Sequence, residues 1–526
     1  MCSHWPGQEP RTSHTAMPEK PIARKRQLEI FVVSFLLYLL ILLPIVFADR
    51  YHLEDWRRLI RGSYGWTGEG RPLADLLMIA LNFGGSLKDI SPLPQLLGIA
   101  LLALATVFLG RKFAISSPLL AALAAFPLGA SPFFLENLSF RFDSLAMCLS
   151  IVMALVPIFM ERREGWTTWI IGAASLFGSL CFYQTGINAF LVFSVTELCT
   201  QQLANVSFPS VVRRAVHRLL QLIGGLIPYL LLAKLMVGGS YNVEHFTYVT
   251  KPSDLGIIKH NWDICWGRIF HSLPGSLRNV FMFPVLLATL VIIVAGFYYL
   301  KRSSLSEPGK LKSAVIVAGI FLLPLAWLTG SLGPLLFPVH ALITLPRIYI
   351  GTGALLASSF VILCTAAAKL RISGKWVCLL LGIPAYVMVM LASIYGNVLV
   401  EQGRYEERIA SGLSLDIQAL ARSHPIKELV VDGVVPYCPI VQHATREYNI
   451  VRVSRNLDSD RLLGDYAHHV YEYYGINLPP ERSAERRSEL IAKATETAPI
   501  ISNGYYDIHL VDEALIVSFF GDIPKK

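Results

Sequence analysis

Acidic and basic side chains alternate in YHLEDWRRLIRGSYGWTGEGRPL, residues 51–73, which directly follow an apolar run. A simple connector needs only a few polar residues, so this density of charge indicates a loop that binds something charged. A carboxylate can take a proton from a hydroxyl group, and an arginine can hold a phosphate through two parallel hydrogen bonds. The loop therefore has the side chains for a transfer reaction in which a phosphate departs.

Other segments carry the same residue types, and all of them fall at predicted outer ends of helices. We expect them to converge at the membrane boundary, where charges are costly and usually functional. The candidate catalytic residues are Glu54 and Asp55. The candidate substrate-binding residues are Arg57, Arg58, Trp66, Arg71, Glu136, Asn137, Arg141, Asp143, Tyr183, Gln184 and Arg347. Arginines would hold the phosphate, and tryptophan and tyrosine would stack on sugar faces.

Each candidate also has a purely structural interpretation. The arginines of the first loop could bind anionic lipid headgroups, and the two acids beside them could only balance that charge. The remaining alternatives are an ion pair at a helix start for Arg141 and Asp143, a membrane anchor for Arg347, and hairpin packing for Tyr183 and Gln184. The recurrence of acids with arginines in two separate loops favours the functional interpretation.

The elements that must position these residues are membrane helices. Hydrophobic residues make up 54% of the 526 residues and charged residues only 16%, well below the roughly one quarter of soluble chains. The apolar residues cluster in runs of about 20, enough to cross a hydrocarbon core of about 30 Å. We predict a mainly α, polytopic bundle with eleven spans: 29–48, 92–109, 113–129, 143–160, 167–183, 185–203, 217–238, 279–299, 313–332, 347–368 and 376–397.

The positions of lysine and arginine give an orientation. Short connections predicted to be inside are basic and nearly free of acids, as cytoplasmic loops are. The N-terminus, with a disordered tail over 1–27, is therefore predicted to be cytoplasmic, and everything after about residue 398 to be periplasmic. The net charge of +9 fits this membrane arrangement, and nothing in the sequence indicates nucleic-acid binding.

Two regions outside the spans have their own pattern. In the first loop, 49–91, LEDWRRLIRG and LADLLMIALNFG have helical spacing, and the second is short enough to lie in the membrane interface. The tail, 398–526, alternates helical patterns with short strand-like runs: ELVVDG, NIVRV, PIISN and ALIVSFF. We predict a small α/β domain there, following the transmembrane domain over 28–397.

An ordered series of motifs resembles a known family. The series comprises EDWRR with GWTGEGRPLADLL, DISPLPQLLGIALL, FFLENLSFRFDSLAMCLS, YQTGIN, LPRIYIG, IYGN and VVDGVVPYCPIV. Together they resemble the serotype-converting glucosyltransferase II family, which belongs to the GT-C class of integral-membrane enzymes. The resemblance runs from residue 30 over nearly the whole chain. Where the family commonly has two aspartates, this chain has Glu54 and Asp55, so Asp55 is the better match for the essential carboxylate.

The resemblance implies a multi-pass enzyme of the bacterial inner membrane. It would move glucose from undecaprenyl phosphate onto an O-antigen or related surface glycan at the periplasmic face. A small flippase and an enzyme that makes the prenyl-phosphate donor would be its functional partners. No cofactor or metal is expected, and the sequence has no Walker or GxGxxG loop and no CxxC or HExxH spacing.

The residues suggest a mechanism for such a transfer. We expect the arginines near Asp55 to keep it ionised, so that it can act as a base opposite the leaving phosphate. One displacement would invert the anomeric centre. Two alternatives stay open, a transporter or flippase for lipid-linked sugars and an O-antigen polymerase. A transporter would favour ionisable residues near mid-span, whereas charge here gathers at the outer mouths.

Overall fold

The computed structural model describes residues 24–520, apart from 116, 161–164, 240–242, 245, 274, 307–309, 341–344, 456–466 and 481–482. The predicted tail over 1–27 falls mostly outside these residues, and helix α1 already begins at Arg24. The described chain is mostly helical, with one small sheet near its C-terminus. The predominance of helix agrees with the predicted fold class.

Seven helices in this part of the chain are long and apolar enough to cross a membrane. They are α1 (Arg24–Phe47), α4 (Leu93–Lys112), α11 (Phe208–Met236), α14 (Gly275–Ser306), α15 (Lys310–Leu332), α16 (Ile350–Lys369) and α17 (Gly374–Ser423). Each corresponds to one of the predicted spans. Together they indicate a membrane protein.

The other four predicted spans are shorter helices. They are α5 (Pro118–Ala125) with α6 (Pro127–Ala130), α8 (Ser144–Phe159), α9 (Trp166–Phe182) and α10 (Asn188–Leu203). The segment 118–130 forms a pair with residues 132–139, which contain η2 (Pro132–Phe134) and α7 (Leu135–Ser139), and the two parts meet at a bend of 48°. Proline begins α5, α6 and η2, where its missing N–H costs nothing but the chain changes direction. By length and composition the described residues contain seven candidate spans, or eight if the bent pair is one span, and eleven remains a prediction.

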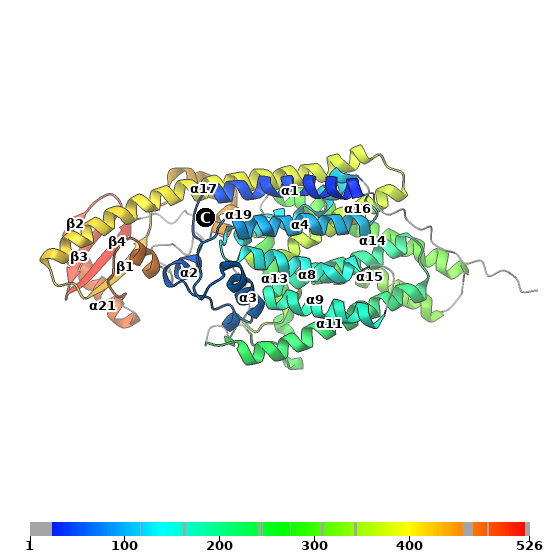
Figure 1. The fold of residues 1–526 in the computed structure, drawn as a ribbon, viewed down its shortest axis with the longest axis horizontal. Helices are drawn as coiled ribbons and strands as arrows, with labels where there is room; N and C mark the ends of the chain where they lie inside the picture. Colours follow the sequence, from blue (N-terminus) through cyan, green and yellow to red (C-terminus); the bar gives the residue numbers. More distant parts are fainter. Residues whose placement is uncertain are drawn as a thin grey trace, which may run out of the picture.

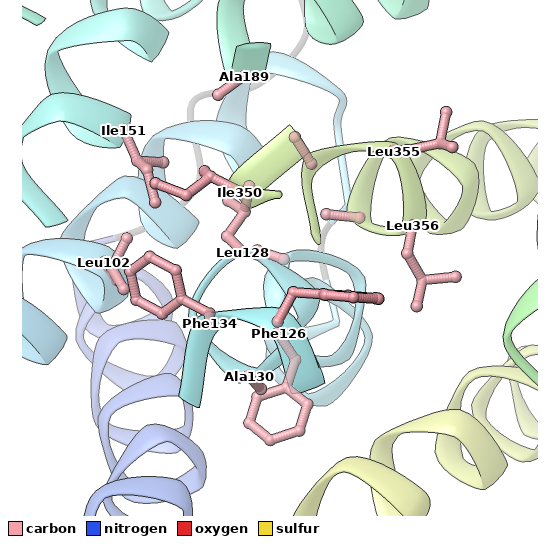
Figure 2. Close-up of a cluster of buried hydrophobic side chains, with 14 of the residues drawn as sticks. Leu102, Phe126, Leu128, Ala130, Phe134, Ile151, Ala189, Ile350, Leu355 and Leu356 are labelled. Atoms are coloured by element: carbon pink, nitrogen blue, oxygen red, sulfur yellow. The ribbon is translucent and has the colours of Figure 1, made fainter. Parts of the chain in front are cut away.

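These shorter helices lie at the centre of the bundle. Figure 2 shows the core where α4, α6, α8 and α16 meet, with Leu102, Leu128, Ile151 and Ile350 contributed by the four helices. Of the long helices, α16 is the most enclosed, whereas α11, α14 and α15 present many apolar side chains on their outer faces. The apolar outer faces are those of helices that contact lipid.

Helix α17 connects the bundle to the C-terminal region. Figure 1 shows it running alongside α1 and then continuing well beyond the bundle to the sheet. It therefore passes straight through residue 398, where the sequence places the start of a separate domain. The division of the chain at that residue stays a prediction.

Beyond α17 lies a four-stranded sheet with the order β1-β4-β3-β2. β1 (Glu428–Val434) is parallel to β4 (Ala514–Phe520), and β3 (Tyr506–Val511) is antiparallel to both β4 and β2 (Ile501–Ser502). Side chains alternate along β4 as a strand requires. Leu515 and Val517 pack toward α17, whereas Ile516 packs toward α21 (Ala484–Thr495).

The tail differs from its predicted pattern in two strands. NIVRV is wrong as a strand, because it forms helix α19 (Asn449–Arg455). Ile450 and Val451 are completely buried within the main core and α19 packs on α17, so tertiary packing overrides the β preference of these residues. β3 was not predicted. Apart from the elements of the first loop, the remaining described elements are α13 (Leu255–Ser272), α18 (Pro439–Glu447), α20 (Ala467–Tyr473), η3 (Gln184–Ile187), η4 (Pro252–Asp254), η5 (Gly333–Leu336) and η6 (Pro346–Ile348).

Candidate active site

The first loop forms two helices, as predicted. α2 (Asp55–Arg61) ends at Gly62, whose positive φ of 58° is the left-handed conformation that glycine adopts readily. α3 (Pro72–Asn82) follows η1 (Thr67–Glu69). Figure 1 shows α2 and α3 together at one end of the bundle, which we call the site end.

Helix α2 is held between the bundle and the C-terminal region. Trp56 is buried among side chains of α17 and the sheet, and its ring lies 5.2 Å from that of Tyr473 on α20. Because successive helical residues point about 100° apart, this contact turns the preceding residues, Glu54 and Asp55, toward the bundle. The burial of Trp56 therefore fixes which way the two candidate carboxylates face.

Asp55 is completely buried. Its Oδ2 accepts hydrogen bonds from the backbone N–H groups of Arg141 (3.0 Å) and His52 (3.4 Å). Its Oδ1 has no hydrogen-bond partner among the described residues. Burial, with a smaller contribution from the neighbouring Asp143, raises the pKa of Asp55 to about 8, even though the two backbone hydrogen bonds and Arg58 act in the opposite direction.

This pKa corrects one expectation. Arginines were expected to keep Asp55 ionised at neutral pH, but its two hydrogen bonds come from backbone N–H groups and burial outweighs the effect of Arg58. In this state the carboxyl group is mostly protonated at pH 7. A buried carboxyl with a pKa near the working pH is the property of a general acid or base.

Glu54 has the opposite character. It forms a two-bonded pair with Arg347, with Oε1 2.9 Å from Nη2 and Oε2 3.3 Å from Nη1. Burial alone would raise the pKa of Glu54, but Arg347 and Arg58 outweigh it and lower the value to about 2. Both partners remain partly exposed, at 18% and 16% of the side chain. The surroundings of the two adjacent acids therefore shift their pKa values in opposite directions.

Arg347 is held by a second set of contacts from the segment ENLSF. Glu136 Oε2 accepts from the Arg347 backbone N–H (2.9 Å), and Glu136 Oε1 lies 3.5 Å from its guanidinium. Asn137 donates to the Arg347 carbonyl (3.1 Å). The motif LPRIYIG is thus placed against LENLS across more than 200 residues of sequence.

Arg58 is buried beneath this cluster and lies over the ring of Trp66, 4.1 Å from its centroid. Its Nη2 is 3.8 Å from both Glu69 and Asp143, while its Nε and Nη1 have no hydrogen-bond partner within the described ranges. Buried donors normally find partners, so an arginine with two free ones is an exception that calls for a ligand. Phosphate oxygens are strong acceptors for guanidinium N–H groups, so phosphate is a ligand that these two donors favour.

The glycine-rich turn positions Trp66. The carboxylate of Asp75, in the first turn of α3, accepts from the backbone N–H groups of Gly65 (2.9 Å), Trp66 (3.1 Å) and Thr67 (2.6 Å). Gly70 has a φ of +73°, and a β-carbon there would lie 2.9 Å from the ring of Phe246. Trp66 is fully buried under Arg58, so in this state it packs on the arginine and offers no open face to a sugar.

Arg71 links three elements. It lies 2.5 Å from Asp143 and 3.4 Å from Glu69, donates to the Phe182 carbonyl (3.0 Å), and lies over the ring of Tyr183. Gln184 completes the contact by donating to the Glu69 carbonyl (3.0 Å) and to the hydroxyl of Tyr229 (2.9 Å). The structure therefore brings Tyr183 and Gln184 into the same cluster as the first loop.

Two predicted site residues lie differently. The guanidinium of Arg141 pairs with Asp89 (2.7 Å) and Asp49 and lies over Tyr51, so only its backbone N–H reaches Asp55. Arg57 has no ion pair with any described residue and is partly exposed on α2. In this state, neither guanidinium belongs to the cluster formed by Arg58, Arg71 and Arg347 with their acidic partners.

Other members of the cluster were not singled out from the sequence. Glu69 contacts both Arg58 and Arg71, His52 lies 3.5 Å from Glu136, and Asp75 holds the turn. Glu69 and Asp75 could have been found, because they are acids in the same charge-rich loop, within four residues of Arg71. Across the described chain, no group of three or more His, Cys, Asp and Glu side chains is arranged to hold a metal ion.

Comparison with known proteins agrees with this arrangement of motifs. The family described as glucosyl transferase GtrII matches residues 43–358, more than half of the chain and a range that contains every candidate site residue. A protein of Salmonella phage P22, described as "Uncharacterized 55.3 kDa protein in gtrB 5'region", is 27% identical over 508 residues, covering 93% of this chain and 98% of that protein. No solved structure matches. The chain belongs to the GtrII glucosyl transferase family.

Proposed function

We propose that the protein moves a glucosyl or related hexosyl unit from an undecaprenyl-phosphate sugar to an O-antigen or related surface glycan. The observation that carries the proposal is the pairing of two incomplete groups at the site end. Asp55 has a free carboxylate oxygen, and the nearby Arg58 has two free donors, among the described residues. The first group suits a base for the acceptor, and the second suits a binding group for a departing phosphate.

The reaction is a single displacement. Asp55 Oδ1 takes the proton from the acceptor hydroxyl as its oxygen bonds to the anomeric carbon. The bond from that carbon to the phosphate oxygen breaks, and its electron pair leaves with the phosphate. Arg58 and Arg71 stabilise the charge that develops there. One displacement inverts the centre, so a β-linked donor gives an α-linked product.

The two carboxylates have separate roles in this scheme. A base works best when its pKa is near the working pH, which favours Asp55 at about 8 over Glu54 at about 2. Glu54 instead orients Arg347 at the exposed side of the cluster. Because Asp55 is fully covered, the acceptor reaches it only after neighbouring side chains move on substrate binding.

We place this reaction at the periplasmic face of the bacterial inner membrane, in a GT-C-like enzyme. The support is the distribution of lysine and arginine along the sequence. It favours a cytoplasmic location for the N-terminus and for the end of the bundle opposite to the site end. A phosphatase reporter fused to the C-terminus is expected to be active, since that enzyme needs the periplasm. A reporter active only in the cytoplasm would contradict the orientation.

We propose that a small flippase and a prenyl-phosphate glucosyltransferase supply the donor. The support is the position of the cluster at one end of the apolar helical bundle, together with the absence of a nucleotide-binding loop from the sequence. The phage P22 relative is described as lying in the gtrB 5' region.

The test is transfer by purified protein in liposomes that contain labelled β-linked undecaprenyl-phosphate glucose and an acceptor glycan. We expect label to appear in the glycan with an α linkage, as measured by NMR. Movement of the labelled lipid across the bilayer without transfer would indicate a flippase. Joining of acceptor units to one another would indicate a polymerase. A retained β linkage would contradict the single displacement.

A further inference from the structure

Every nitrogen of the Arg71 guanidinium already has an acceptor in this state. Its Nε donates to the Phe182 carbonyl (3.0 Å), its Nη2 pairs with Asp143 (2.5 Å) and its Nη1 pairs with Glu69 (3.4 Å). A phosphate that an arginine holds through two parallel hydrogen bonds uses two of these three nitrogens. A donor phosphate that binds Arg71 must therefore compete with at least one of the acceptors already there.

Glu69 is the most weakly held of the three acceptors. Its carboxylate lies 3.4 Å from Arg71 and 3.8 Å from Arg58, whereas a strong bond between charged groups has a length of about 2.7–2.9 Å. Its side chain is 31% exposed, compared with 4% for Asp143. Partial burial raises the pKa of Glu69 in spite of both arginines, so their contacts do not fully offset the cost of placing its charge there.

The backbone of Glu69 is fixed, although its side chain is not. Its N–H donates to the Trp66 carbonyl (3.0 Å), and its own carbonyl accepts from the Gln184 side chain (3.0 Å). The preceding residues of the turn are held by the Asp75 carboxylate, which accepts from the N–H groups of Trp66 and Thr67. The Glu69 carboxylate can therefore leave the arginines by rotation of its side chain toward solvent, while the turn stays in place.

The charges around the two arginines leave no place for a further anion. Two acids, Asp143 and Glu69, face two arginines, Arg58 and Arg71, so this group of four is balanced. The phosphate of a sugar phosphodiester adds one negative charge, and like charges repel strongly where water is largely excluded. If Glu69 turns to solvent, the phosphate takes its place and the balance is kept.

We propose that the Glu69 carboxylate occupies the position of the donor phosphate in this state and is displaced when the donor binds. This rests on the proposed function, since it takes the donor to be a phosphate-linked sugar. Glu69 then sets how tightly the donor is held without contacting the reacting atoms. Apparent affinity falls in proportion to the competent fraction, so a protein in which Glu69 has left about one tenth to one third of molecules binds about three- to tenfold more weakly.

The experiment measures the Kd of labelled undecaprenyl-phosphate glucose for wild type and Glu69→Gln in nanodiscs, together with kcat of transfer. The amide keeps the shape of the side chain but loses its charge, so Kd should fall about three- to tenfold while kcat stays within about twofold. The matched control is Glu472→Gln on α20, because that carboxylate is 36% exposed and also lies 3.4 Å from an arginine, Arg61 of α2. The control should keep the wild-type Kd.

Other results would overturn the inference. A raised Kd for Glu69→Gln would show that Glu69 supports the arginines, an unchanged Kd that it does not compete, and an equal fall in the control that only the general loss of negative charge matters. Binding of the donor by neither protein would also overturn it.

A second variant covers the case in which Glu69→Gln does not fold. Glu69→Asp keeps the charge but shortens the side chain, so its carboxylate reaches the arginines less well and Kd should fall by a smaller factor. An unchanged or raised Kd there would contradict the inference. If Kd falls as expected and no sugar is transferred by wild type, the proposed function fails while the competition by Glu69 stands, so the two failures are distinguishable.

Discussion

Two buried ionic clusters of the described bundle differ in how completely their carboxylates are paired, although each also contains an arginine nitrogen without a hydrogen-bond partner among the described residues, such as Arg218 Nη2 in the second. In the first, at the site end, Asp55 Oδ1 and two nitrogens of Arg58 have no partner among the described residues. In the second, both oxygens of Glu197 on α10 are bound, by Lys112 at 2.6 Å and Arg218 at 2.8 Å. Glu197 is 13 residues beyond Gln184, or about 20 Å along the helix axis.

The difference in carboxylate pairing distinguishes a candidate active site from a cluster that only stabilises the fold. The Glu197 cluster joins the ends of α4, α10 and α11, and its carboxylate has no oxygen left to offer a ligand. At the site end Asp55 keeps a carboxyl oxygen without a partner among the described residues, which costs free energy unless a substrate uses it. A buried carboxylate with both oxygens bound is therefore structural, whereas one with a free oxygen can offer it to a substrate.

The largest expected effect is on Asp55. Asp55→Asn removes the base but keeps the shape of the side chain and its backbone hydrogen bonds, so transfer should fall by about 10²–10⁴. Donor binding and thermal unfolding should change little. The measurement is the initial transfer rate beside a Tm in detergent, with Glu54→Gln as the matched variant, for which we expect a milder loss. Wild-type turnover by Asp55→Asn would remove Asp55 from the chemistry.

A smaller effect is expected from the arginines. Arg58→Lys or Arg71→Lys keeps the charge but loses the planar pair of donors, so KM for the donor should rise about tenfold to a hundredfold. Arg141→Lys is the comparison, because its guanidinium pairs with Asp49 and Asp89 and does not face these residues. It should change donor KM less than threefold. An equal loss in all three variants would contradict the distinction drawn here.

The smallest effect on activity is expected from the second cluster. Glu197→Gln leaves Lys112, Arg214 and Arg218 without their carboxylate, which should lower the free energy of unfolding by about 3–5 kcal/mol. The folded fraction should keep its kcat/KM. Glu401→Gln is the control, since its ion pair with Arg404 is exposed and should contribute at most about 1 kcal/mol. A selective loss of transfer by Glu197→Gln would mean that the second cluster is also functional.

Part of this arrangement could be predicted from the sequence. Apolar runs of spanning length predict the seven long helices, and helical spacing with Gly62 predicts α2 and its end. The charge-rich loops predict that residues from four segments converge at one end of the bundle. These features depend on the local pattern of apolar and charged residues, which can be read from the sequence directly.

The pairing of side chains could not be predicted. Arg141 is close to Asp55 in space, but its side chain turns to Asp49 and Asp89 because Tyr51 and those acids surround it. The pKa of Asp55 depends on complete burial by α2 packing, which two adjacent acids in a sequence do not report. The helical conformation of NIVRV could not be predicted either, because it depends on packing against distant residues of α17.

The central claim is that Asp55, and not Glu54, is the base, and the pH dependence of kcat/KM tests it most directly. With a pKa of about 8, Asp55 is about one tenth ionised at pH 7 and nearly fully ionised above pH 9. Because only the ionised form accepts a proton, kcat/KM should rise roughly tenfold from pH 7 to 9, and Asp55→Asn should abolish the rise in the residual activity. A wild-type profile that stays flat from pH 6 to 9, as a base with the pKa of Glu54 would give, would contradict the account.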